Sequence, residues 1–378
     1  MPESKRSSKN LIESFRAIAE SANSHNAIES YLSMTPRFPQ HVFIRQYIVY
    51  HKEDLLESIE RKTPNFPYVN VLQKNPLVFE IKRPETQTRS AVSGVLTVLP
   101  SSQTNISRIT TISYSNFWNI GVKPLIKKIY PKGMPVFFRQ DEIESSLYKV
   151  EETLGSDYRI RIADVTLKEE RSNSQESRRK IFDTERRWTD LPIKDIFSQA
   201  KERNQWFTGL SFIIQKKRKN TRAYLQVSKG RLNKYGEVSF NSFYNELISS
   251  LLFTLESYAG DRFKLLQKRG IRERGYDPSI PIEISYSYEA FSRIEEVRRF
   301  GKIISSYPNS TKAVFHSNPY YHASVADFLD GSSFDIWVLS DRRIVIIPQA
   351  KSSAQAFERL ISHIFSNFGE GTVNEFNT

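Results

Sequence analysis

Three residues near the C-terminal end have types and a spacing that could do chemistry. Asp335 lies at the start of one apolar run, FDIWVLS, and Gln349 and Lys351 lie at the end of the next, RIVIIPQAK. Both runs are rich in Ile, Val and Trp, which suit a pleated, half-buried surface. We therefore expect a hairpin that turns at Asp341-Arg342 and sets the acid across from the glutamine and the lysine. Gln349 and Lys351 should share a face, because side chains alternate along a strand.

An acid in such a place can hold a divalent metal, which activates a bound water and steadies the charge on a phosphoryl group. The pattern resembles the PD-(D/E)xK nucleases, and it is most similar to the Mrr-type restriction endonucleases. In that subgroup glutamine replaces the second acid, and the aspartate follows a Gly-containing turn such as Asp330-Gly331. The resemblance covers about residues 330–365. It implies a restriction-endonuclease-like domain in which Asp335 and Gln349 hold Mg²⁺ or Mn²⁺ and Lys351 assists phosphodiester hydrolysis.

The same residues have a plainer interpretation, as the solvated ends of a hairpin. Pro348 favours an edge strand, since proline cannot donate a hydrogen bond to a strand ladder. The upstream helix of the nuclease family should carry an acid facing the metal, and Glu295 and Glu296 are available there. A second acid-x-Lys sequence, Glu80-Ile-Lys82, is expected to be an ordinary strand end, because no suitable aspartate lies on a preceding hairpin strand.

The segment before the hairpin is predicted to be a long loop that carries histidines and acids. Such groups could ligate zinc or manganese in a metal-dependent hydrolase. Their spacing matches no established ligand pattern, so satisfied surface or core groups are the competing interpretation, with a turn at the Asn-Pro sequence. The residues are His316, Asn318, His322, Asp327 and Asp330.

A run of cations without an acid lies between residues 215 and 234, with Tyr224 and Tyr235 interleaved. We expect residues 210–215 and 223–228 to form a hairpin with a cationic tip. Such a tip neutralises phosphates and releases counterions, and nearby aromatic rings could stack on unpaired bases. A second basic cluster spans Lys264 to Arg274, and a solvated loop is the alternative for both. The predicted nucleic-acid-binding residues are Lys216, Lys217, Arg218, Lys219, Arg222, Lys229, Arg231 and Lys234.

The overall composition supports a polyanionic partner. The chain of 378 residues has a net charge of +13 at neutral pH, which favours nucleic acid, an anionic membrane or an acidic protein. It has no cysteine, which excludes disulfides, thiolate catalysis and Cys-ligated zinc and fits a cytoplasmic protein. No apolar run approaches the roughly 20 residues that span a bilayer, and no motif for binding nucleotide phosphates occurs.

The local patterns predict a mixed α/β protein with two domains. We expect an N-terminal α/β domain at residues 1–167, a charged linker or solvated helix at 168–190, and a C-terminal α/β domain at 191–378 that holds the basic segment and the candidate site. The expected helices cover residues 11–34, 52–61, 116–129, 141–154, 193–206, 240–258, 288–307 and 352–368. The expected strands outside the two hairpins cover residues 41–50, 68–82, 94–99, 107–114, 159–167 and 280–286.

The sequence thus predicts a nucleic-acid-binding protein. The nuclease resemblance implies a metal-dependent enzyme in DNA processing or prokaryotic antiviral defence. The alternative is a non-catalytic subunit of a larger assembly, whose basic surface holds nucleic acid or an acidic partner protein. Nothing in the sequence chooses between DNA and RNA.

Overall fold

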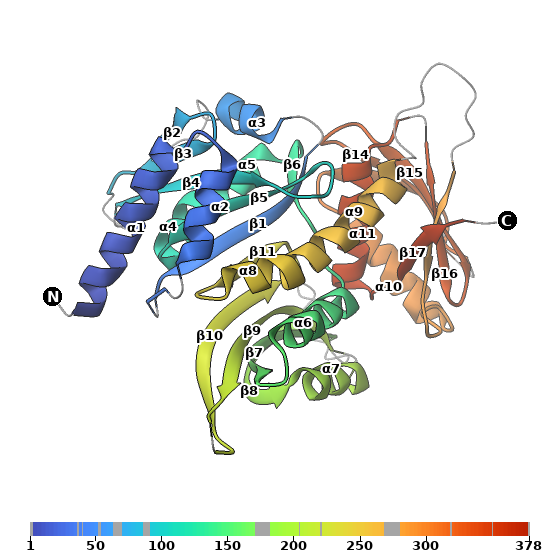
Figure 1. Ribbon diagram of the computed structural model, residues 1–378. Coiled ribbons are helices and arrows are strands. Elements are labelled where there is room, and N and C mark those ends of the chain that lie inside the picture. Colours follow the sequence, from blue (N-terminus) through green and yellow to red (C-terminus); the bar gives the residue numbers. More distant parts are fainter. Residues whose placement is uncertain are drawn as a thin grey trace. The chain divides into compact units, whose positions relative to one another are not determined.

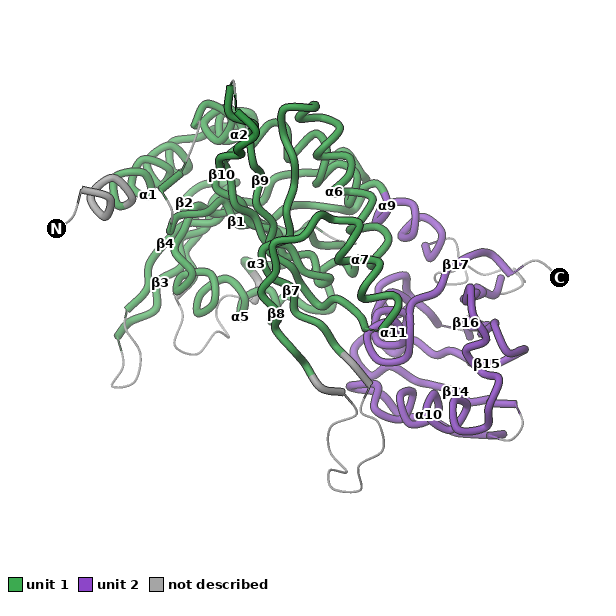
Figure 2. Tube along the Cα trace, turned by 90° about the horizontal axis from the view of Figure 1, so that it is seen from below, with its two compact units in different colours: residues 1–257 green, residues 258–378 purple. Residues whose placement is uncertain are grey.

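The computed structural model (Figure 1) describes residues 3–376 apart from residues 36–37, 40, 52–53, 63–69, 86–90, 171–181, 204, 220, 268–279, 318–319 and 350. The chain divides into two compact units, coloured separately in Figure 2: unit 1 is residues 1–257 and unit 2 is residues 258–378. Each unit has its own antiparallel sheet with helices packed on it. The predicted mixed α+β fold class is therefore confirmed.

Within the described residues, the sheet of unit 1 has eleven strands in the order β2-β3-β4-β5-β1-β11-β10-β9-β7-β8, with β6 paired to β1. Every one of its pairings is antiparallel. The strands are β1 (Phe43–His51), β2 (Asn70–Asn75), β3 (Val78–Arg83), β4 (Val92–Pro100), β5 (Ile106–Ser113), β6 (Gly133–Pro135), β7 (Tyr158–Glu170), β8 (Phe182–Pro192), β9 (Trp206–Lys217), β10 (Tyr224–Asn233) and β11 (Glu237–Phe240).

Two groups of helices pack on this sheet. One face is covered by α1 (Glu3–Ser21), α2 (His25–Met34), α6 (Gln140–Leu154), α7 (Ile193–Glu202), and the continuous run α8 (Tyr244–Leu247), η3 (Ile248–Leu252) and the first turn of α9 (Phe253–Gln267), up to Ser257. The opposite face, over β1 and β3 to β5, is covered by α3 (Leu55–Lys62), α4 (Ser115–Phe117), η2 (Trp118–Val122) and α5 (Lys123–Ile129).

The alternation of side chains on the strands explains this division. Tyr47 of β1 faces η2, where its ring stacks on Trp118 at 5.1 Å between centroids. Arg108 of β5 reaches the other group, and pairs with Glu29 of α2 at 3.0 Å and with Glu256 of α9 at 3.3 Å. We call the face that carries Tyr47 the outer face of the unit 1 sheet.

The predicted linker is wrong as a domain boundary. Strands β7 and β8 extend into the charged segment from both sides and pair with each other, for example Lys168 with Thr184. Strand β9 then pairs with β7, so the chain on both sides of the segment belongs to one sheet. The boundary between the units falls at Ser257, inside α9, and residues 171–181 lie outside the described part of the chain.

Unit 2 is built on a smaller antiparallel sheet. In the described residues it has six strands in the order β13-β14-β15-β16-β12-β17. Helices α10 (Ile294–Ser305) and α11 (Ala354–Asn367) pack on one of its faces, where Phe300 meets Tyr321 and Phe334 meets Phe357. The strands are β12 (Ile282–Ser285), β13 (Ser310–His316), β14 (His322–Asp327), β15 (Ser333–Ser340), β16 (Arg343–Pro348) and β17 (Thr372–Glu375).

The hairpin β15–β16 and the amphipathic helix α11 match the prediction from the sequence. The long loop predicted before them is wrong, because residues 310–316 and 322–327 pair as the strands β13 and β14 of a second hairpin. The expectation of an edge strand at Pro348 is also wrong, since β16 lies between β15 and β12. Proline is tolerated there because it is the last residue of β16, beyond the part that pairs with β12.

Candidate functional site

The acid and the glutamine of the predicted site do meet. Asp335 is half-buried on β15, on the face of the unit 2 sheet opposite α10 and α11. Its Oδ2 accepts a hydrogen bond from Gln349 Nε2 at 2.6 Å. Its Oδ1 accepts one from the hydroxyl of Ser324, which lies directly across on β14. Both carboxylate oxygens are thus engaged by neutral donors of the sheet itself.

The lysine of the predicted site points elsewhere. Lys351 is exposed, and its Nζ lies beside Gly331, where an added Cβ would be only 3.1 Å away. Within the described residues no ion pair joins Lys351 to Asp335. The physical reason is an interruption of the ladder after β16: Gln349 N donates to Ser333 O, whereas Ser333 N donates to Lys351 O. Gln349 and Lys351 thus bond to the same residue, Ser333. The strict alternation that would have put the side chains of Gln349 and Lys351 on one face of the sheet is therefore lost.

The donor set around Asp335 does not fit Mg²⁺ or Mn²⁺. These ions prefer several oxygen ligands in near-octahedral geometry. Among the described residues no group of three or more His, Asp and Glu side chains is placed to hold a metal. Gln349 directs its N–H₂ group at the carboxylate, and its amide oxygen is not the atom that approaches. We therefore derive no step through a metal here, and nuclease activity stays a prediction.

The histidines and acids of residues 316–330 do not converge either. The ring of His322 stacks on Trp337 at 3.7 Å between centroids, on the open face of the sheet. Asp327 is 1% exposed on the opposite, helix-covered side, where it accepts from Tyr307 Oη at 2.7 Å and from Arg359 Nε at 2.9 Å. Asn318 lies outside the described residues. Asp327 is therefore a structural anchor, since it ties β14 to Tyr307 and to Arg359 of α11.

Asp330 belongs to the same anchor. Its carboxylate accepts hydrogen bonds from the hydroxyl of Ser353 and from Ser332 N at 3.0 Å, and it lies 3.3 Å from Arg359. Burial by itself would raise the pKa of Asp330, but these donors and the guanidinium outweigh it and lower the pKa. This carboxylate closes the turn that leads from β14 into β15.

The second acid-x-Lys sequence is also structural. Glu80 is 1% exposed in β3, and its carboxylate pairs with Lys74 at 3.4 Å, Lys82 at 3.0 Å and with Arg16 of α1. Strand β3 lies between β2 and β4, so Glu80 sits within the sheet and not at its end. Its three cations leave no group free for chemistry on a substrate.

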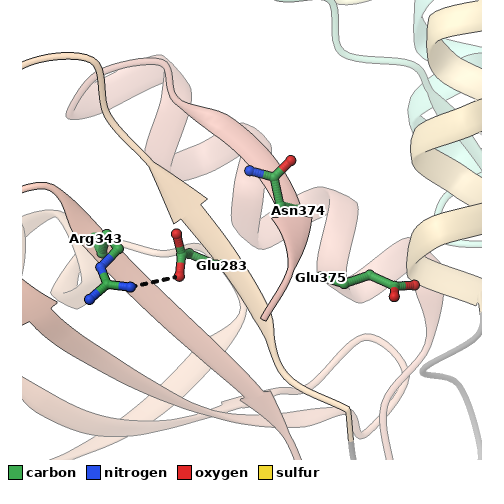
Figure 3. Close-up of a pocket in the computed structure, with 4 residues that line it drawn as sticks. All are labelled: Glu283, Arg343, Asn374 and Glu375. Atoms are coloured by element: carbon green, nitrogen blue, oxygen red, sulfur yellow. Dashed lines mark ion pairs between the residues drawn. The ribbon is translucent and has the colours of Figure 1, made fainter. Parts of the chain in front are cut away.

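A shallow pocket of about 560 Å³ lies at β12, β16 and β17 of unit 2. Figure 3 shows its four labelled residues, Glu283, Arg343, Asn374 and Glu375. Glu283 and Arg343 pair with each other at 3.5 Å, so the two groups neutralise one another. Nothing in this lining activates a nucleophile or a proton donor.

The basic segment forms the predicted hairpin. Strands β9 and β10 pair from Lys217–Tyr224 down to Gly209–Asn233, with one bulge near Gln226. Seven of the eight predicted cations are exposed, and no ion pair within 4.0 Å involves any of them in the described part of the chain. The eighth, Lys234, is only 3% exposed, so its placement on the binding surface is wrong. It follows β10 at the point where the chain turns back into the sheet.

Of the second basic cluster, Lys264 is described in α9, and it pairs with Asp261 at 3.6 Å. Residues 268–274 lie outside the described residues. The cluster therefore contributes nothing to a site that can be argued from contacts.

Sequence reasoning missed the neighbours of the hairpin. Arg159 of β7 donates to Gln215 of β9 at 2.8 Å, and its guanidinium lies 3.7 Å from the ring centre of Tyr224. On β8, Arg186 lies 4.5 Å from the ring centre of Trp188, which is 69% exposed. The i, i+2 spacing of Arg159 and Arg161 is a signal for one cationic strand face, but the sequence does not show that this face adjoins β9.

Two comparisons with known proteins add no name to this site. A scan against protein-family models finds no match. A search of curated proteins finds no significant match. Among the described residues, no helix combines the length and apolar character needed to cross a lipid bilayer.

Proposed function

We propose that the protein binds nucleic acid through the β9–β10 hairpin. The observation that carries the proposal is the set of seven exposed cations on this hairpin that have no carboxylate within 4.0 Å among the described residues. An unpaired cation on a projecting hairpin keeps its full field toward solvent. Contacts of this kind with phosphates release counterions and supply most of the affinity of sequence-independent binding.

The hairpin gathers seven such cations on two paired strands and their turn. Some exposed cations elsewhere have acidic neighbours, such as Lys149 with Glu152 at 2.8 Å and Arg342 with Glu289 at 3.3 Å. Exposed pairs of that kind contribute little to stability, but they cancel the local charge. Others, such as Lys127 and Lys128, have no carboxylate within 4.0 Å among the described residues, but they do not form a cluster of this size. A polyanion is therefore attracted to the hairpin more than to these regions.

The test compares two triple charge reversals that change the net charge equally. One is Lys217→Glu with Arg218→Glu and Lys219→Glu at the tip. The matched control is Lys127→Glu with Lys128→Glu and Lys149→Glu, all exposed on α5 and α6. Binding to labelled single-stranded and duplex oligonucleotides is measured by fluorescence anisotropy across a salt series.

We expect the tip variant to bind the oligonucleotides at least about tenfold more weakly than the natural protein. The slope of log affinity against log salt concentration should fall by about one for each lost phosphate contact. The control should stay within a few-fold of the natural protein. Equal weakening in both variants would mean that net charge alone acts, and the hairpin would lose its assigned role.

The same hairpin suits an acidic partner protein, which would make the chain a non-catalytic subunit of a larger assembly. The salt dependence of binding distinguishes nucleic acid from an acidic protein as the ligand of the hairpin. Nucleic acid gives a linear fall of log affinity with log salt concentration, with a slope set by the number of phosphates neutralised. The absence of binding to any oligonucleotide, with an acidic protein recovered by the natural chain and lost with the tip variant, would favour the subunit role.

Metal-dependent cleavage in DNA processing or antiviral defence is the second candidate, and the observation in its favour is that the β15–β16 hairpin brings Gln349 next to Asp335. It predicts Mg²⁺- or Mn²⁺-dependent nicking of plasmid DNA that disappears in both Asp335→Ala and Lys351→Ala while binding survives. Cleavage that persists in both variants, or that is absent from the natural protein, would remove this candidate. A cytoplasmic location is part of the same proposal and is supported by the absence of cysteine.

A further inference from the structure

The outer face of the unit 1 sheet carries one continuous row of side chains across its strands. Residues in register share a face, so the pairings of β8, β7, β9, β10, β11 and β1 define the row. From one edge inward it is made of Trp188, Asp164, Ser211, Arg231, Ser239 and Arg45. Trp188 thus lies at one end of the row and Arg231 and Arg45 toward the other, and the residues between them are Asp164, Ser211 and Ser239.

Over β7 to β10, the described part of unit 1 places no helix on the outer face. Helices α6 and α7 pack on the other side of β7 to β9, where Phe197 of α7 meets Phe207 at 4.7 Å. Among the described residues of unit 1, helices η2 and α5 cover the outer face over β1 and β3 to β5. Lys229 and Arg231 of β10 are exposed, while Ser211 and Ser239 beside Arg231 are 3% and 5% exposed. The long side chains of Lys229 and Arg231 therefore extend beyond the small, buried side chains of Ser211 and Ser239.

The acids on this face are already paired. Asp164 lies 3.2 Å from Arg186, and Glu237 lies 2.9 Å from Lys123 and accepts from Trp118 Nε1 at 2.7 Å. Arg45, Lys229 and Arg231 have no carboxylate within 4.0 Å among the described residues. Over β10 the face therefore carries two positive charges, Lys229 and Arg231, that no carboxylate of the described chain approaches within 4.0 Å.

Arg45 and Arg231 also act on one another. Arg45 is 9% exposed, donates to Ser113 O and Ser115 Oγ, and lies two strands from Arg231. Burial lowers the pKa of Arg45, the nearby Glu237 raises it, and the positive charge of Arg231 lowers it again.

Trp188 provides the second kind of contact. Its ring is 69% exposed, and the guanidinium of Arg186 lies 4.5 Å from the ring centre. The stacked arginine holds the ring in one orientation and leaves most of its surface to solvent. Such a ring is a platform for an unpaired base, whose π-face is free, whereas the bases of a duplex are stacked inside it.

The geometry points to the outer face of unit 1 as a binding surface for single-stranded nucleic acid. The backbone crosses Lys229 and Arg231, and a base stacks on Trp188. With strands about 4.8 Å apart, the row from Trp188 to Arg231 spans roughly 14 Å, a length that suits a short single strand. This inference rests on the proposed function, since the cationic hairpin borders the same face. It adds that the bound strand is unpaired.

The test uses the full chain with two probes of equal length, a labelled oligothymidylate of about 15 nucleotides and a duplex. Trp188→Ala is compared with Tyr148→Ala, which removes an exposed ring, 40% exposed, from α6 on the other side of the sheet. Arg231→Gln is compared with Lys149→Gln, which removes one exposed charge from α6. Quenching of tryptophan fluorescence by oligothymidylate is followed in parallel in Trp188→Phe.

We expect Trp188→Ala to weaken oligothymidylate binding by about tenfold, as the loss of one stacked base does, and to change duplex binding by less than twofold. Arg231→Gln should lower the salt slope for oligothymidylate by about one, both controls should resemble the natural protein, and Trp188→Phe should lose most of the quenching. Unchanged binding in Trp188→Ala together with weakening by the tip reversals would overturn this inference and leave the proposed function standing. No binding of either probe by the natural chain would remove both.

Discussion

Arg359 of α11 binds Asp327 of β14 through two nitrogens, with Nε at 2.9 Å and a terminal guanidinium nitrogen at 2.7 Å from the same Oδ2. The two residues are 6% and 1% exposed, and the hydroxyl of Tyr307 donates to the same oxygen. This pair joins the sheet of unit 2 to the helix that covers it. An acid that the sequence offered as a metal ligand is thus committed to holding the fold.

Replacing Asp327 should therefore destabilise unit 2 strongly. Asp327→Ala removes the nearest carboxylate of the buried Arg359 guanidinium and leaves Asp330 at 3.3 Å, and breaking a buried pair in this way costs about 3–5 kcal/mol. Tyr307→Phe removes only one neutral hydrogen bond to the same carboxylate and should cost about 1 kcal/mol. Urea unfolding monitored through Trp337, the one tryptophan in residues 258–378, measures both. A similar small loss in the two variants would show that the pair is not important for stability.

Acid should weaken unit 2 through Asp330. The native pKa of this carboxyl is lowered, while its unfolded value is about 3.9. Its stabilising contribution is therefore complete at pH values above the unfolded pKa, and it is lost as the pH falls through the lower native pKa. Asp330→Asn should be less stable than the natural protein at pH 7, and the difference should shrink below about pH 4. Unfolding curves at pH 7, 4 and 3 test the sign, and a difference that grows on acidification would contradict it.

The hydrogen bond from Gln349 to Asp335 should appear as a coupling between the two side chains. Gln349→Ala and Asp335→Ala should each lower the stability of unit 2 by about 1–2 kcal/mol. The double variant should lose less than the sum, by about 1 kcal/mol, because both single changes remove the same contact. Strict additivity would show that the contact contributes nothing. Because the groups lie in unit 2, oligonucleotide binding by the hairpin should be unaffected in all three variants.

The cationic strand β10 depends on a close approach at Gly230. A Cβ at this position would overlap the ring of Phe212 on the neighbouring strand β9. Gly230→Ala should therefore destabilise unit 1 by about 1–3 kcal/mol, as overpacking does, and weaken binding by displacing Lys229 and Arg231. Adding Phe212→Leu makes room for the methyl group and should restore part of both losses. Thermal unfolding and anisotropy measure the two effects, and a harmless Gly230→Ala would contradict the close approach.

Local patterns in the sequence were sufficient for the elements whose partners are close in the chain. Alternating apolar runs on either side of a short turn predicted the hairpins β15–β16 and β9–β10, and helical spacing predicted α11. The meeting of Asp335 and Gln349 followed from the first hairpin, because a short turn sets the register of its strands. The run of lysines and arginines predicted the cationic tip for the same local reason.

Only the tertiary structure decided which elements share a sheet and which side chains share a face. Strands β7 and β9 belong with β1 through pairings across long stretches of chain, and no local pattern encodes such pairings, so the boundary predicted near residue 168 was wrong. A break in the ladder at Ser333 turned Lys351 away from Asp335, and burial removed Lys234 from the cationic surface. The sequence by itself determined the local elements and their charge, because period and turn residues act over a few positions. The row from Trp188 to Arg45 exists only once distant strands have paired, because register between strands is a property of the whole sheet.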